Sequence, residues 1–219
     1  MRPAIERVLQ TIGKGCVGAE IGVEKGDNAY SILEDLQPKK LYLIDIGDFN
    51  GSDHNPSTPK GTFEATMERY LMTPNVTCMM MSSERASKRF KDESLDFVYI
   101  DADHSYNGIS VDLECWIPKV RIGGIISGHD CRVVDVQRAL KETFKKYEIS
   151  GEDWLVTKEK GMAKKKKKVE EKVEILNTEV IVEEKVQESQ AQICISAGCS
   201  RYALKEGLCT HCLNDLGRL

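Results

Sequence analysis

The sequence predicts an α/β protein built on a doubly wound sheet of mostly parallel strands, followed by a small C-terminal metal-binding unit. Two observations predict the sheet. Apolar runs of strand length alternate with helix-like segments up to about residue 158, and the runs are apolar throughout. Such strands are buried on both faces, as in a parallel sheet covered by helices. Four cysteines crowded near the C-terminus predict the second unit.

The first elements follow from spacing and helix stops. Apolar residues recur at the spacing of one helical face within residues 3–12, which predicts a helix. Residues 17–23 form a short strand, and a helix over about 27–36 ends before Pro38. Residues 41–46 are an apolar run of strand length.

The alternation then continues to about residue 158. Residues 47–60 are rich in Gly, Asp, Asn, Ser and Pro, which predicts a loop and the best candidate for a lid over a ligand. The further expected helices span 62–71, 84–90, 109–120 and 133–147, and the further expected strands span 76–81, 95–100, 124–127 and 154–157.

Composition narrows the class of protein. Hydrophobic residues make up 41% of the 219 residues, which suits a packed core, and the net charge of −4 gives no global attraction to nucleic acid. No apolar run is long enough to cross a bilayer, and the first ten residues contain no hydrophobic signal region. We therefore expect a cytoplasmic protein with reduced thiols and no membrane partner. Cys16, Cys78, Cys115 and Cys131 are expected to be small buried side chains.

A doubly wound sheet binds ligands beyond the carboxyl ends of its strands, so the residues after each strand carry the functional prediction. The first strand runs through Glu20 and Gly22 to Gly26 and Asn28. The glycines permit a tight turn and a close approach of backbone to ligand, and the next helix begins with free N–H groups. Their spacing differs from the dinucleotide fingerprint, which disfavours a pyrophosphate cradle.

The second and third strands add further candidates. Asp45 ends the second strand, where an acid can accept hydrogen bonds from both hydroxyls of a ribose. After the third strand, Ser82 or Ser83 caps the next helix or, alternatively, contacts an adenine ring.

The fourth and fifth strands carry the densest pattern. The fourth runs into Asp101, Asp103 and His104, and the fifth into His129 and Asp130. Charged groups beside buried strands need a partner, and adjacent parallel strands would bring Asp101 close to His129 and Asp130. Two carboxylates and an imidazole suit a divalent cation. The alternative is that these residues only cap helices.

These motifs, over about residues 15–157, resemble class I S-adenosylmethionine-dependent methyltransferases. Among these they resemble the small metal-assisted O-methyltransferases that include macrolide-sugar and caffeoyl-CoA O-methyltransferases. The resemblance implies a Rossmann-like seven-stranded sheet whose last strand is antiparallel. It also implies methyl transfer from S-adenosylmethionine to an oxygen of a small-molecule or sugar acceptor, with Mg²⁺ or Mn²⁺ as the cation.

The resemblance further implies a role for each strand-end residue. At the methionine part of the cofactor it places Glu20, Gly22, Gly26 and Asn28. It places Asp45 at the ribose and Ser83 near the adenine. It also places Asp101 beside the cofactor and Asp103 in contact with the amino group. Asp101, His129 and Asp130 match the positions that hold the cation. Relatives have Asp-Asn or Glu-Asp where this chain has His129-Asp130, which leaves the identity and presence of the metal open.

The implied mechanism asks little covalent chemistry of the protein. The sulfonium makes the methyl group electrophilic, so the protein must align an acceptor oxygen behind the methyl carbon. A cation held through Asp101 would orient that oxygen and lower its pKa. His104 is the candidate base because imidazole titrates near neutrality; a structural hydrogen bond is its alternative role.

The four C-terminal cysteines have the spacing of a zinc knuckle. Cys194, Cys199, Cys209 and Cys212 form two close pairs that can surround one Zn²⁺ tetrahedrally. A unit this small buries too little core to fold alone, so metal binding would supply its folding energy.

The chain therefore divides into a methyltransferase domain over 1–158, a charged flexible linker over 159–192 and a zinc knuckle over 193–219. One alternative function is a degenerate methyltransferase-fold binding module. Another is a nucleic-acid methyltransferase directed by the knuckle and the lysine run 164–168; the chain lacks the Asn/Asp-Pro-Pro-Tyr-type motif of enzymes that methylate base amino groups. A homo-oligomer, the partner of the knuckle and the identity of the acceptor stay open.

Overall fold

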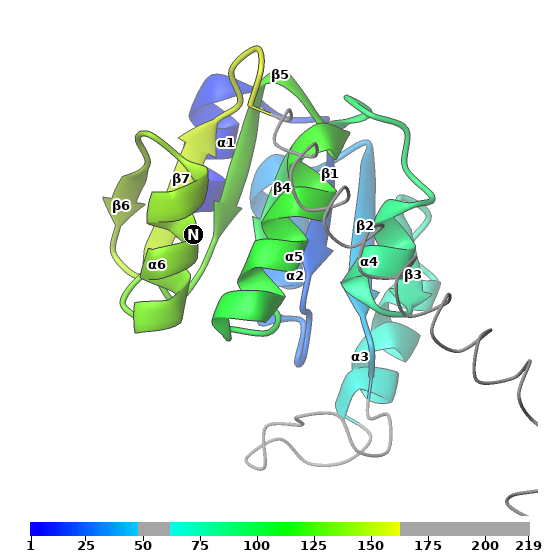
Figure 1. Ribbon diagram of the computed structural model, residues 1–219. Helices are drawn as coiled ribbons and strands as arrows, with labels where there is room; N and C mark the ends of the chain where they lie inside the picture. The colour runs from blue at the N-terminus through cyan, green and yellow to red at the C-terminus, as the bar shows by residue number, and fades with distance from the viewer. Residues whose placement is uncertain (48–61, 163–219) are drawn as a thin grey trace, which may run out of the picture. The chain divides into compact units, whose positions relative to one another are not determined.

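A computed structural model describes residues 1–47 and 62–162 of the chain (Figure 1). The predicted lid from residue 48 onward, the linker from residue 163 onward and the four C-terminal cysteines lie outside the described residues. In the described part, seven strands form one sheet in the order β3-β2-β1-β4-β5-β7-β6. The strands are β1 (Val17–Ile21), β2 (Lys40–Asp45), β3 (Val76–Met80), β4 (Leu95–Ile100), β5 (Val120–Gly128), β6 (Glu148–Ser150) and β7 (Asp153–Thr157).

The strand directions confirm the expected topology. Strands β3, β2, β1, β4 and β5 are mutually parallel, whereas β7 runs antiparallel to β5 and β6 antiparallel to β7. The last strand along the chain, β7, is thus the one that runs antiparallel to the five parallel strands. The order reverses next to β1, so β1 and β4 form the switch point where doubly wound sheets bind ligands.

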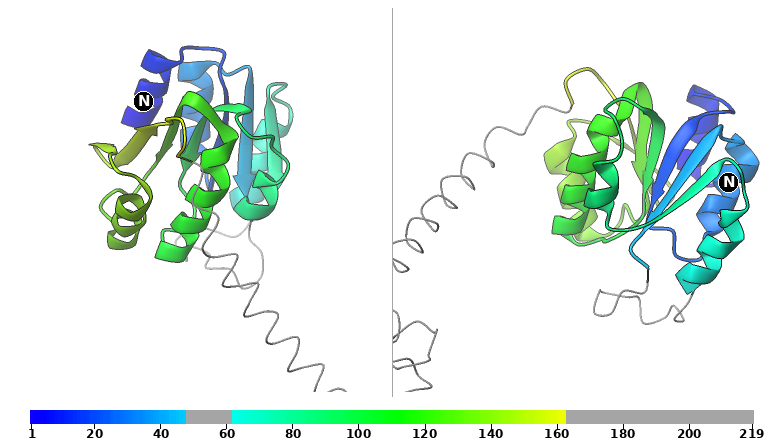
Figure 2. Two further views of the ribbon diagram at one scale, coloured as in Figure 1. Left: turned by 45° about the horizontal axis from the view of Figure 1, so that its top comes forward. Right: turned by 90° about the vertical axis from the view of Figure 1, so that its right-hand side faces the viewer.

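Helices cover both faces of the sheet, as the two views of Figure 2 show. They are α1 (Pro3–Thr11), α2 (Asp27–Leu36), α3 (Thr62–Leu71), α4 (Ser83–Ser87), α5 (Tyr106–Trp116) and α6 (Val134–Thr143), with a 3₁₀ turn η1 (Ile117–Lys119) after α5. One buried cluster joins α1, α2 and α3 to the sheet, and a second joins α4, α5 and α6 to its other face. This two-sided burial is why the strands are apolar throughout.

Several elements differ from the sequence prediction, and α4 (Ser83–Ser87) and α6 (Val134–Thr143) end before the expected residues 90 and 147. Strand β6 is unpredicted because all three of its residues are exposed, so no hydrophobic pattern marks it; β7 holds it through backbone pairing. Helix α5 starts at Tyr106, three residues early, because the Ser105 hydroxyl accepts the Gly108 N–H and caps it. Strand β5 likewise begins at Val120, where the expected helix over 109–120 has already ended.

The cysteines of the described part are all free thiols. Cys16 and Cys131 are buried as expected, whereas Cys78 and Cys115 are only half-buried. Across residues 1–47 and 62–162, no helix combines the length and the apolar character that a membrane span requires.

Candidate functional site

The carboxyl ends of four neighbouring strands meet at one edge of the sheet. Ile21 at the end of β1 pairs with Ile44 on one side and with Ile100 on the other. Backbone pairing continues one step beyond the strands. The Asp101 N–H donates to the Ile21 carbonyl at 2.7 Å, and the His129 N–H donates to the Ile100 carbonyl at 3.1 Å. The acids predicted to converge therefore do lie along a single edge.

The first turn of this edge can be built only with glycine. Gly22 has a φ of +81°, and a Cβ on it would lie 2.1 Å from the Asp101 carbonyl oxygen. Gly26, the N-cap of α2, has a φ of +75°, and a Cβ there would lie 2.7 Å from Cγ2 of Thr66. Both predicted glycines thus let the turn pack closely against a neighbouring part of the protein, which a residue with a Cβ could not do.

Glu20 and Asn28 form a buried polar pair beneath this turn. The Asn28 amide donates to Oε1 of Glu20 at 3.2 Å. Glu20 Oε2 and Asn28 Oδ1 are fully buried and have no hydrogen-bond partner within the described residues. Burial raises the pKa of Glu20 to about 8, and the nearby negative charge of Asp101 adds to the rise, against the lowering effect of Asn28 and Arg2. Two unpartnered buried oxygens in a native fold call for a further partner.

Asp45 braces the same turn from the end of β2. Its Oδ2 accepts the N–H groups of Val23 at 2.8 Å and Glu24 at 3.1 Å, and its Oδ1 accepts the Gly47 N–H at 2.9 Å. These bonds fix the carboxylate beside the turn. Its remaining lone pairs stay available to the predicted ribose hydroxyls.

The two serines after β3 have different partners: Ser82 caps the next helix, and Ser83 contacts α5. Ser82 is the N-cap of α4, where its hydroxyl accepts the Arg85 N–H. The Ser83 hydroxyl donates to Asp112 and accepts from Trp116 Nε1 at 2.8 Å. The Ser83 hydroxyl is therefore bonded to residues of α5. A contact between Ser83 and an adenine ring would have to come from its backbone. Burial raises the pKa of Asp112 to about 6.

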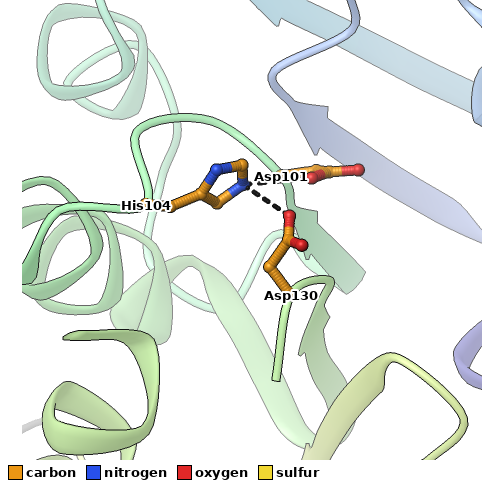
Figure 3. Close-up of side chains that lie close together, drawn as sticks. All are labelled: Asp101, His104 and Asp130. Carbon is orange, nitrogen blue, oxygen red and sulfur yellow. Dashed lines mark hydrogen bonds and ion pairs between the residues drawn. The ribbon is translucent and has the colours of Figure 1, made fainter. Parts of the chain in front are cut away.

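Asp101, His104 and Asp130 form a compact cluster at the ends of β4 and β5 (Figure 3). Nε2 of His104 lies 3.3 Å from Oδ1 of Asp101 and 2.9 Å from Oδ2 of Asp130. One ligand atom from each of the three side chains lies within 4.8 Å of the other two, a spacing that one cation could bridge. The hydrogen bond to Asp101, together with the charge of Asp130, raises the pKa of His104 against the opposing effect of burial.

His129 lies at the margin of this cluster. Its Nδ1 is 3.3 Å from Oδ2 of Asp130 but 4.0 Å from Oδ1 of Asp101. The sequence placed His129 among the three cation-holding residues and gave His104 the role of base, whereas the geometry brings His104 into the three-residue group. Asp130 adopts a left-handed φ of +55°, a conformation that Asp tolerates better than most residues.

Asp103 is turned toward the start of α5. Its carboxylate accepts the N–H and the hydroxyl of Ser105, each at 2.8 Å, and a Cβ on Gly108 would strike it at 2.3 Å. The structure thus uses this carboxylate to order the loop between β4 and α5. In the predicted contact with the cofactor's amino group, the Asp103 carboxylate would accept a further hydrogen bond besides the two from Ser105.

Arg2 is a site residue that sequence reasoning missed. Its Nη1 donates to the Tyr99 hydroxyl at 2.6 Å and to Oδ2 of Asp101 at 3.3 Å. The Tyr99 hydroxyl in turn donates to Oδ1 of Asp153 at 2.8 Å, and Oδ2 of Asp153 accepts the Ala4 N–H at 3.0 Å. Arg2 precedes a helix-starting proline, a local signal, but nothing local connects it to a strand 97 residues away.

The sequence that forms this fold matches a known protein family. Residues 19–131, more than half of the chain, match the family described as a methyltransferase domain. The chain belongs to this methyltransferase family. The matched residues run from β1 to just beyond Asp130, so they contain the glycine turn, Asp45 and the Asp101 cluster of the methyltransferase. No protein of curated function matches the sequence.

Solved structures share the methyltransferase fold at low sequence identity. A Corynebacterium glutamicum protein is 18% identical with a TM-score of 0.52, over 71% of this chain and 78% of its own. MycE methyltransferase from the mycinamycin biosynthetic pathway, solved with Mg and SAH (S-adenosylhomocysteine), is 14% identical with a TM-score of 0.51, over 72% of this chain and 49% of its own. A Streptococcus mutans protein solved with SAH is 12% identical with a TM-score of 0.51, over 71% of this chain and 96% of its own. This methyltransferase thus spans about half the length of MycE.

Proposed function

We propose that the protein transfers a methyl group from S-adenosylmethionine to an oxygen of a small-molecule or sugar acceptor, with a divalent cation at the Asp101 cluster. One observation carries the proposal: the glycine turn, the unpartnered Glu20–Asn28 pair and the Asp101–His104–Asp130 cluster share one edge of the sheet. The proposal is supported by the crystal structure of MycE, a methyltransferase of the same fold, which contains both Mg and SAH.

The glycine turn fits the amino-acid part of the cofactor. S-adenosylmethionine carries an ammonium group, and Glu20 Oε2 and Asn28 Oδ1 are buried oxygens without a hydrogen-bond partner within the described residues. A bound ammonium group would favour the charged form of the Glu20 carboxyl, which accepts hydrogen bonds. Gly22 lets the turn pass directly against the backbone of Asp101, because a Cβ on it would lie 2.1 Å from the Asp101 carbonyl oxygen. In this proposal Gly26 opens α2 below the cofactor, and Asp45 holds the ribose. S-adenosylmethionine supplies the electrophilic methyl group.

The Asp101 cluster fits a divalent cation. Two carboxylates and one imidazole nitrogen already lie within ligand spacing of one another, and each comes from a separate position at the ends of β4 and β5. Mn²⁺ or Mg²⁺ there would act as a Lewis acid beside the acceptor. We assign Asp101, Asp130 and His104 as the ligands, with His129 next to them. Sequence reasoning made His129 the third ligand. Its Nδ1 lies 4.0 Å from Asp101, against 3.3 Å for Nε2 of His104, so His104 is the nearer ligand and His129 an additional candidate.

The ligand and base roles of His104 exclude each other, since the same atom, Nε2, faces both carboxylates. If His104 binds the cation, its replacement by alanine weakens cation binding. If it is the proton acceptor, that replacement abolishes methyl transfer and leaves cation binding unchanged. The acceptor oxygen must lie within hydrogen-bond reach of the group that takes its proton, so the cluster also marks the position of the acceptor.

The rival proposal, a degenerate fold that only binds a partner, fits the site less well. A fold that only binds a partner has no need for strained or unpartnered groups at this edge, yet the buried pair, the left-handed Asp130 and the glycine turn are all present.

Calorimetric titration with S-adenosylmethionine, with and without Mn²⁺ or Mg²⁺, tests the proposal directly. We expect cofactor binding that Glu20→Gln weakens, and cation binding that Asp130→Asn weakens. A protein of native thermal stability that binds neither S-adenosylmethionine nor SAH would contradict the enzyme proposal.

The C-terminal segment is proposed to bind one Zn²⁺ through Cys194, Cys199, Cys209 and Cys212. The support is the pairing and spacing of the four thiols in the sequence. The location of the protein in the cytoplasm, where these thiols stay reduced, is part of the same proposal.

A further inference from the structure

The amino-acid part of S-adenosylmethionine carries a carboxylate as well as an ammonium group, and the site edge is poorly suited to it. The side chains along this edge include the acids Asp45, Asp101 and Asp130. A carboxylate entering among them would be repelled unless a cation lay at hand. This inference rests on the proposed function, because it concerns a further contact with the same cofactor.

Arg2 is a cation fixed at this edge. Tyr99 is the partner of Glu20 in the β1–β4 pairing, so the two side chains leave the sheet on the same face. That face is the one covered by α1, α2 and α3, and Arg2 is the N-cap of α1. The positive charge of Arg2 acts on Glu20, where it opposes the rise in the pKa of that carboxyl. Arg2 is therefore bonded to the residue of β4 that stands opposite Glu20 in β1.

The guanidinium of Arg2 is held rigidly but is only partly used. Nη1 makes both hydrogen bonds, to Tyr99 and to Asp101, and the guanidinium carbon lies 5.5 Å from the centre of the Tyr99 ring. Asp153 fixes the Tyr99 hydroxyl from β7. The side chain of Arg2 is 33% exposed, and its two hydrogen bonds both come from Nη1, so the guanidinium has further N–H donors beyond those two bonds.

We propose that Arg2 binds the carboxylate of the amino-acid part of S-adenosylmethionine, with Tyr99 and Asp153 holding the guanidinium in place. A guanidinium suits this role because it offers donors in a planar fork and stays charged. The division of charge is then complementary: Glu20 and Asn28 face the ammonium group, and Arg2 faces the carboxylate. Arg2 also orients Asp101 by holding Oδ2, which leaves Oδ1 facing His104.

Two ligands that differ in this part alone test the proposal. SAH keeps the amino-acid part, whereas 5′-methylthioadenosine keeps the adenosine and the sulfur but lacks the amino and carboxylate groups. Calorimetry should show that Arg2→Gln weakens SAH binding about 10- to 100-fold, as expected for the loss of a charge-assisted hydrogen bond. Binding of 5′-methylthioadenosine should change less than about threefold. Arg2→Lys, which keeps the charge, should recover part of the affinity for SAH.

Matched variants separate this contact from general damage. Arg7→Gln removes another ion-paired guanidinium from α1, the one bound to Glu148, and should leave both affinities unchanged. Lys25→Gln removes the exposed cation of the glycine turn and tests the rival donor. If Arg2→Gln does not fold, Tyr99→Phe keeps Arg2 but removes the hydroxyl that fixes it, and should still weaken SAH binding selectively.

Each result decides the matter. Equal losses for both ligands, no loss in Arg2→Gln, or a selective loss in Lys25→Gln would each overturn the assignment of Arg2. If the folded wild-type protein binds neither ligand, the proposed function fails and this inference fails with it.

Discussion

Asn28 donates its side-chain amide to one oxygen of the Glu20 carboxyl at 3.2 Å, while the other oxygen, Oε2, is buried with no partner in the described part of the chain. The pair links the end of β1 to the first turn of α2 beneath the glycine turn. Because burial disfavours the charged carboxylate, Glu20 makes the protein's stability depend on pH, and in the proposed function the same group binds the cofactor.

The first prediction concerns stability against pH. The pKa of Glu20 rises from its ordinary value of 4.5 to about 8 on folding, so the folded protein holds a proton that the unfolded chain releases. The stabilisation is complete below about pH 4.5 and is lost as the pH rises toward 8. Glu20→Gln removes this loss. The variant should therefore gain stability relative to the wild type between about pH 5 and about pH 9, by on the order of a few kcal/mol.

Urea unfolding at several pH values measures this difference. Asp92→Asn is the matched control, since Asp92 is an exposed acid whose partner is Lys119, and its stability difference should not grow with pH. A Glu20→Gln difference that stays constant over the same range would show that Glu20 is already charged in the folded protein.

The second prediction concerns the cation site. Asp130→Asn and His104→Ala should each lower the affinity for Mn²⁺ at least about tenfold, because each removes one ligand atom of the cluster. His129→Ala should have a smaller effect, since its Nδ1 lies 4.0 Å from Asp101. Electron paramagnetic resonance of free Mn²⁺ measures the affinities without any turnover. Unchanged affinity in His104→Ala with loss of methyl transfer would return His104 to the role of base.

The third prediction concerns the glycine turn. Gly22→Ala places a Cβ 2.1 Å from the Asp101 carbonyl, in a conformation with a φ of +81°. Gly13→Ala is a matched control, because Gly13 has a φ of +90° but nothing within 4 Å of its Cβ position. Backbone strain alone should cost about 1–2 kcal/mol in Gly13→Ala. Gly22→Ala should cost more and should also weaken SAH binding.

Thermal unfolding and SAH titration of both variants measure these effects. Equal destabilisation of the two, with SAH binding intact, would mean that the turn relaxes away from Asp101 without consequence for the site.

The fourth prediction concerns the C-terminal cysteines. Elemental analysis should find one zinc per chain, and Cys209→Ser should lose it, because a tetrahedral site tolerates no missing thiolate. Cys78→Ser, a change at a half-buried free thiol of the sheet, should keep the metal. Zinc retained in Cys209→Ser would rule out the four-thiolate site.

Sequence patterns predicted most of the fold because burial leaves a regular trace in the chain. Helices α2 and α3 and strand β4 have the expected bounds, since each pattern ends at a clear stop. Strand β6 escaped prediction because its residues are exposed and only the backbone of β7 holds it. Among the site residues, Glu20, Gly22, Asp45, Asp101 and Asp130 do meet at one edge, because parallel strands bring their carboxyl ends together.

The sequence by itself determined the sheet, its burial on both faces and the edge at which the candidate site residues gather, since these depend on hydrophobic periodicity and on which residues follow each strand. Only the tertiary structure decided how the polar side chains share their partners. It turned Ser83 toward Asp112, drew His104 between Asp101 and Asp130, and brought Arg2 across to Tyr99. The physical reason is that hydrogen bonds and ion pairs depend on directions and distances of a few ångströms between residues far apart in the chain, which no local pattern encodes.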